Sequence, residues 1–143
     1  MTVPVWMLLA FATWTVVLLL GTVGVYRWSR ILTGHVPIRE FRADRVEGED
    51  WYKRAMRAHA NCVENLPVFG AVVLALHFGD VRGAMVNAVC IGVVVARVLQ
   101  SLVHVSLVQT NAVVSLRFVF FIVQLVGFLS LTVAIVRQVG VTW

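Results

Sequence analysis

The stretch KRAMRAHANCVENLP, from Lys53 to Pro67, places charged and polar side chains at the mouth of a hydrophobic segment. At about 100° per residue, four of these side chains fall on one face of an α-helix. The four are Arg54, Arg57, Asn61 and Glu64. Ionisable groups at membrane depth are costly unless they face a partner or a watery cavity. We therefore predict that this polar stripe, on a helix that enters a membrane, marks a functional site.

The rest of the chain is rich in apolar residues. Of its 143 residues, 60% are hydrophobic and only 13% are charged, whereas soluble domains are about half apolar. One crossing of the bilayer needs about 20 apolar residues. Four crossings fit and no linker divides the chain, so we expect a single all-α integral membrane domain, an up-down four-helix bundle over residues 1–143. The predicted spans are about residues 5–26, 61–78, 83–106 and 115–136. The first run is longer than a signal-peptide core and lacks a basic start, so we expect it to be a permanent span.

The formal charge of +5 is concentrated between Arg27 and Arg57. Because basic residues beside membrane spans stay in the cytoplasm, the loop at about residues 27–52 is predicted to be cytoplasmic, with both termini on the opposite side. In a bacterium the membrane would be the cell inner membrane. Basic residues such as Arg45 alternate with acidic ones such as Asp44. This pattern argues against nucleic acid and favours the lipid bilayer as the partner. Tryptophans near the predicted boundaries are typical of interfacial anchors, namely Trp6, Trp28, Trp51 and Trp143.

The two cysteines, Cys62 and Cys90, both lie in predicted spans and form no CxxC pair. A membrane disulfide oxidoreductase needs paired, accessible thiols of low pKa, so the sequence argues against that class of enzyme. The four histidines have no metal-ligand spacing. We expect no metal site.

A second polar stripe lies in the third predicted span. Its members have the i, i+3, i+4, i+7 spacing of one helical face, and they are Arg97, Gln100, Ser101 and His104. The fourth span opens with Arg117, and Gln124 continues its face seven residues later. With the long loop in the cytoplasm, the three stripes are predicted to converge at one depth.

The important imbalance is an excess of arginines around one carboxylate, Glu64. Arg97 is predicted to lie roughly 10 to 15 Å inside its span, which is deep for a charged side chain. A small ligand with carboxylates would complete this cluster, because guanidinium groups bind carboxylates in two-pronged fashion. For Glu64 and Asn61, interhelical structural contacts are an equal alternative. His104 either exchanges protons near neutral pH or packs in the bundle.

The segment RAMRAHANCVENLP, residues 54–67, resembles the signature of the MAPEG family, the membrane-associated proteins of eicosanoid and glutathione metabolism. The shared order is R, RAHxN, xxE and P. The segment ARVLQS, residues 96–101, is similar to the ARIxHT segment of microsomal glutathione transferases and prostaglandin E synthase. Arg117, at the opening of the last helix, also matches. The sequence departs from the family where Gln100 replaces the motif histidine and where His104 stands at a position that is often tyrosine.

The resemblance implies a left-handed four-helix bundle that assembles as a homotrimer, with glutathione bound as co-substrate between neighbouring subunits near the cytoplasmic side. It implies that Arg117 is the catalytic residue that stabilises the glutathione thiolate. The candidate glutathione-binding residues are Arg54, Arg57, Asn61, Glu64, Arg97, Ser101 and His104.

Two functions of different classes follow from these residues. The first is a membrane-embedded, glutathione-dependent transferase or peroxidase-like protein that acts on a lipophilic electrophile from the bilayer. The alternative is a non-catalytic protein of the MAPEG fold that binds lipid or serves as a scaffold and keeps the polar stripes as structural contacts. A small transporter is disfavoured, because its ionisable residues would be accessible from both sides and here they gather toward one.

Overall fold

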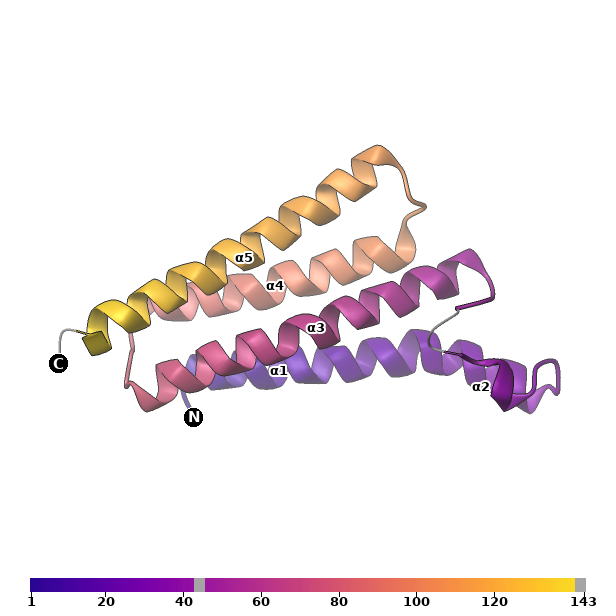
Figure 1. Cartoon of the computed structure of the whole chain (residues 1–143), viewed down its shortest axis with the longest axis horizontal. Helices are drawn as coiled ribbons and strands as arrows, with labels where there is room; N and C mark the ends of the chain where they lie inside the picture. The colour runs from indigo at the N-terminus through magenta and orange to yellow at the C-terminus, as the bar shows by residue number, and fades with distance from the viewer. Residues whose placement is uncertain (43–45, 141–143) are drawn as a thin grey trace.

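The computed structural model describes residues 1–42 and 46–140 of the chain, and its regular elements are helices (Figure 1). Asp44, Arg45 and Trp143 lie outside the described residues. The elements in chain order are α1 (Val3–Leu18), η1 (Leu19–Gly24), α2 (Val25–Leu32), η2 (Ile38–Glu40), α3 (Asp50–Phe78), α4 (Ala84–Ser106) and α5 (Asn111–Val139).

Four helical stretches are long and apolar enough to cross a membrane. They are Val3–Leu32, Asp50–Phe78, Ala84–Ser106 and Asn111–Gln138. The expectation of an all-α protein with four membrane-crossing helices is therefore confirmed. The helices run up and down in turn, and both described ends of the chain lie at the same end of the bundle (Figure 1).

The first membrane helix is built from three pieces, because the π-helical turn η1 joins α1 to α2. Within this turn, Thr22 Oγ1 donates a hydrogen bond to the carbonyl oxygen of Leu18 at 2.6 Å. Such turns occur mostly as local insertions inside an α-helix. The helix thus continues to Leu32 and projects beyond the bundle (Figure 1).

The centre of the bundle is a dry aromatic core shared by three helices. The rings of Phe11 and Phe69 have centroids 5.7 Å apart, and those of Phe69 and Phe128 are 5.9 Å apart. Beside this core, α4 and α5 approach closely, since a Cβ added at Gly127 would lie 2.6 Å from Val93 Cγ2. A side chain at position 127 would force these two helices apart.

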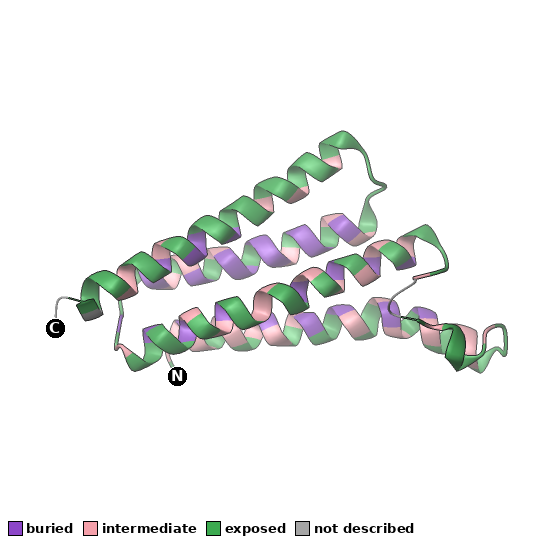
Figure 2. Ribbon diagram, viewed as in Figure 1, coloured by how far each residue is buried: buried purple, intermediate pink, exposed green. Residues whose placement is uncertain are grey.

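The helix α5 follows α4 over its second half and diverges from it toward Asn111 (Figure 1). Burial follows this geometry. Residues on the facing sides of α1, α3 and α4 are buried, whereas the first half of α5 is mostly exposed (Figure 2). The bundle is therefore closed at the end that holds the described termini and more open at the opposite end, where α5 begins.

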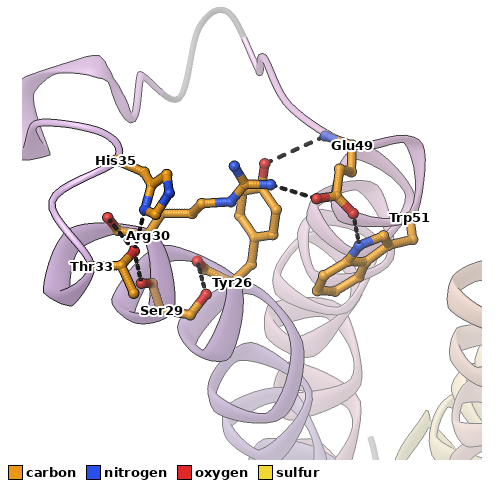
Figure 3. A network of polar contacts seen from close by, with 7 residues as sticks. All are labelled: Tyr26, Ser29, Arg30, Thr33, His35, Glu49 and Trp51. Atoms are coloured by element: carbon orange, nitrogen blue, oxygen red, sulfur yellow. Dashed lines mark hydrogen bonds and ion pairs between the residues drawn. The ribbon is translucent and has the colours of Figure 1, made fainter.

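A polar network ties the projecting α2 to the start of α3 (Figure 3). Arg30 Nη2 lies 2.5 Å from Glu49 Oε1, and Trp51 Nε1 donates to Glu49 Oε2 at 2.7 Å. Behind these groups, the rings of Tyr26 and Tyr52 stack with centroids 4.1 Å apart. The network fixes where α3 begins, and so sets the position of the polar stripe that follows.

Candidate functional site

The stripe on α3 starts one turn after the helix begins and faces the open end of the bundle. Arg54 is half-buried, and its Nε donates to the backbone carbonyl oxygen of Val105 on α4 at 3.3 Å. Asn61 is also half-buried, whereas Arg57 and Glu64 are exposed. The stripe therefore presents two side chains toward α4 and two to the outside of the single chain.

The stripe on α4 is buried along its whole length, unlike the one on α3. Its members are Arg97, Gln100, Ser101 and His104. Ser101 Oγ donates to the carbonyl oxygen of Arg97 at 2.8 Å and lies 3.4 Å from Cys62 Sγ on α3. The apolar residues around this stripe give it a low-dielectric setting, in which charge interactions are strong and unpaired charge is expensive.

Arg97 is the most unusual side chain of the site. Only 1% of the residue is exposed, and its Nε and Nη2 have no hydrogen-bond partner. The guanidinium carbon lies 5.5 Å from the centre of the Phe11 ring, a favourable cation–π arrangement that leaves Nε and Nη2 without a hydrogen-bond partner. A buried guanidinium group with free donors is costly unless a partner completes it.

His104 marks the point where the stripes meet. Its side chain is buried, and the charges of Arg117, Arg57 and Arg54 all act on it. These arginines come from α5 and α3, so cationic groups of two helices lie within electrostatic range of a residue of α4. The structure thus brings together side chains that are far apart in the sequence.

Arg117 lines a pocket of about 200 Å³ at the open side of the bundle. The same pocket is lined by Asn61 of α3 and Gln100 of α4, and Phe118 and Phe121 of α5 contribute apolar walls. A second pocket, of about 270 Å³, lies nearer the end of the bundle between Arg54 and Arg57. The Arg117 pocket combines a guanidinium group with aromatic surface, which suits a ligand that is anionic at one end. The second pocket is polar, and its lining also includes Asp50 and Lys53.

Glu64 does not neutralise this positive charge. In the part of the chain that the structure describes, its carboxylate forms no ion pair with Arg57, Arg97 or Arg117, although its charge does act on Arg97. Within residues 1–42 and 46–140, no group of three His, Cys, Asp or Glu side chains could hold a metal ion. Cationic groups are therefore in excess over Glu64 among the described residues of the site.

Two features of the site escape the sequence patterns. Cys62 contacts Ser101, a neighbour that helical spacing within one helix does not reveal. Phe11 lies against Arg97 although it comes from the first helix, in a stretch without any charged residue to single it out. Both contacts depend on how helices pack side by side, and the only sequence signal for them is the uninterrupted apolar face of each helix.

The family model of the MAPEG family matches residues 3–137 of the chain. Comparison with curated proteins and with solved structures gave no match. Because the match covers nearly the whole chain, the chain belongs to the MAPEG family. With four apolar helices, it is an integral membrane protein.

Proposed function

We propose that this MAPEG family member is a glutathione-dependent transferase or peroxidase-like protein that acts on a lipophilic electrophile in the bilayer. The observation that carries the proposal is Arg97, buried to 1% exposure with Nε and Nη2 unpartnered. A protein seldom keeps a buried cation in this state unless a ligand or partner completes it. A non-catalytic scaffold has no use for these free donors, and a non-catalytic lipid-binding protein, the other form of the alternative, is separated from the proposed function by the titration with glutathione below.

Glutathione carries negative and positive groups that complement the arginines and the glutamate of the site. Its two carboxylates suit the guanidinium groups of Arg97, Arg57 and Arg54, which form two-pronged hydrogen bonds with carboxylates. Its ammonium group suits Glu64, which is exposed and forms no ion pair among the described residues. Asn61, Ser101 and His104 complete the proposed set of glutathione-binding residues with uncharged donors and acceptors.

Arg117 is the proposed catalytic residue. An ordinary thiol has a pKa of about 8.5, and a nearby guanidinium group in a poorly hydrated pocket lowers it by favouring the thiolate. The thiolate sulfur would then form a bond to the electrophilic atom of a lipophilic molecule that arrives from the bilayer, while the bond from that atom to its leaving group breaks and the leaving group departs with the electron pair. The phenyl rings of Phe118 and Phe121, in the wall of the same pocket, offer apolar surface for that molecule.

We further propose that the protein works as a homotrimer with the site near its cytoplasmic face. Arg57 and Glu64 point outward from the single chain, and the first half of α5 exposes Phe118 and Val119, so a neighbouring subunit would close the site. The basic loop at the same end supports a cytoplasmic placement and termini on the opposite side. In a bacterium the proposed location is the cell inner membrane.

Calorimetric titration of the purified full chain in lipid nanodiscs with glutathione tests the proposal. We expect saturable heat that is unchanged in Arg82→Ala, a matched control because Arg82 lies at the opposite end, exposed and paired with Asp80. Consumption of glutathione with a generic aromatic electrophile and with a lipid hydroperoxide then distinguishes conjugation from peroxide reduction. If the wild-type chain gives neither heat nor thermal stabilisation, the non-catalytic alternative is correct.

A further inference from the structure

A short series of side-chain amide hydrogen bonds connects α4 to α5 and ends at the backbone carbonyl of Arg117. Gln124 Nε2 donates to Gln100 Oε1 at 3.0 Å, and Gln100 Nε2 donates to the backbone carbonyl oxygen of Arg117 at 2.9 Å. Gln124 is completely buried and Gln100 nearly so. We propose that this glutamine relay, Gln124 to Gln100 to the Arg117 carbonyl, positions Arg117 at the glutathione thiol. The proposal rests on the proposed function above.

The relay has only one workable direction. Gln124 Nε2 also donates to the carbonyl oxygen of Phe120 at 2.8 Å, so both of its protons face acceptors. Gln100 must then present its oxygen to Gln124 and its amino group to Arg117. Turning the Gln100 amide over would bring two amino groups together at one end and two oxygens at the other. Gln124 therefore sets the orientation of Gln100, which in turn sets the position of the Arg117 backbone.

The position of the relay in α5 explains why Arg117 needs it. Close packing between α4 and α5 occurs at Gly127, on the C-terminal side of Gln124 in α5. Toward its N-terminal end α5 diverges from α4 (Figure 1). In that part of α5, Phe118 is 60% exposed. Within the described residues, the two side-chain hydrogen bonds between α4 and α5 are those of the relay. Apolar packing alone would leave this part of α5 free to shift.

A shift of Arg117 would affect the thiol more than it affects glutathione binding. Gln100 and Arg117 line the same pocket of about 200 Å³, so the relay forms part of the pocket wall. Electrostatic stabilisation of a thiolate depends steeply on where the cation lies, whereas the carboxylates of glutathione would be held by other arginines. Loss of the relay should therefore change thiol ionisation before it changes affinity.

The test compares Gln100→Leu and Gln124→Leu with two controls, in the full chain reconstituted in nanodiscs. Gln100→His keeps an N–H donor at the relay, and Thr132→Val removes a hydroxyl that donates only to its own helix, at the carbonyl oxygen of Phe128. The readout is the pH titration of the near-ultraviolet thiolate absorbance of bound glutathione. We expect both leucine variants to lower the thiolate-to-thiol ratio at neutral pH about tenfold, equivalent to a rise of about one unit in the thiol pKa. Glutathione affinity should change less. Thr132→Val should behave as wild type, and Gln100→His should lose less thiolate than Gln100→Leu.

A second measurement needs no glutathione. Hydrogen exchange of α5 in Gln124→Leu should be faster over residues 111–120 and unchanged over residues 128–138, because the close contact at Gly127 persists. If the leucine variants do not assemble, Gln124→Asn, which keeps the amide on a shorter side chain, should show the same changes in smaller measure.

The outcomes separate this inference from the function on which it rests. Wild-type thiolate titration and wild-type exchange in both leucine variants would overturn the relay and leave the glutathione function standing. Faster exchange along the whole of α5 would show that the glutamines only hold the bundle together. The absence of any thiolate signal in the wild-type chain would overturn both proposals.

Discussion

Two groups of arginines at the same end of the bundle differ in how their charge is satisfied. In the polar network between α2 and the start of α3, Arg30 pairs with Glu49, and its guanidinium carbon lies 5.2 Å from the centre of the Tyr26 ring. Beside it, Arg27 Nε donates to Tyr52 Oη at 2.8 Å. Inside the bundle, Arg97 has a cation–π neighbour and two nitrogens without partners. Arg27 and Arg30 of α2 are thus satisfied by partners in the same chain, whereas Arg97 of α4 keeps two donor nitrogens without a partner.

The largest expected effect is on Arg97. Replacing it in Arg97→Leu should weaken glutathione binding at least about 30-fold, because the carboxylate of the ligand loses a buried partner. The thermal unfolding temperature without glutathione should stay the same or rise, since an unpaired buried charge is replaced by an apolar side chain. Calorimetry and thermal unfolding measure the two quantities. A variant that loses stability and keeps wild-type affinity would make Arg97 a structural residue and remove the contrast with the loop.

Arg117→Ala should give the next largest effect, with a different signature. Glutathione should still bind, but without the near-ultraviolet absorbance of a thiolate, because the cation nearest the thiol is gone. The proposed trimer should persist in this variant, as measured by size-exclusion chromatography with light scattering. Thiolate absorbance at the wild-type level in this variant would assign thiol activation to another residue.

The smallest effect on stability and binding is expected for a substitution in the polar network between α2 and α3. Arg30→Ala should lower the free energy of unfolding by less than about 1 kcal/mol, because its pair with Glu49 is partly exposed. A double-mutant cycle with Glu49→Ala isolates the pair from other effects. Glutathione affinity should be unchanged in both single variants. If Arg30→Ala lost as much glutathione affinity as Arg97→Leu, Arg30 would also be a ligand-binding residue.

Much of the fold follows from the sequence because membrane insertion imposes simple rules. Apolar runs of sufficient length had to become helices, and the four that the sequence predicts are present. The π-helical turn at Leu19–Gly24 was not predicted, since it leaves the apolar pattern of the run unchanged. The divergence of α5 was not predicted either, because helix crossing depends on side-chain packing such as the contact at Gly127.

For the site, helical spacing predicts which side chains share a face of a helix. It does not predict which of them have hydrogen-bond partners. Ser101 and Gln100, read from the same stripe as Arg97, turn out to be hydrogen-bonded within the bundle. Arg97 alone in that stripe keeps unpartnered donors in the described structure. Hydrogen-bond partners come from neighbouring helices, and a single helix pattern carries no information about them. The roles of these residues in glutathione binding stay predictions.

The most direct test is a cryo-electron microscopy structure of the protein in nanodiscs with glutathione added. We expect a carboxylate oxygen of glutathione about 2.7 to 2.9 Å from Arg97 Nη2 or Nε, the distance of a charge-assisted hydrogen bond. The Arg117 guanidinium should face the glutathione sulfur. A structure in which a carboxylate of the protein itself occupies the free donors of Arg97, with glutathione absent from the site, would contradict the account.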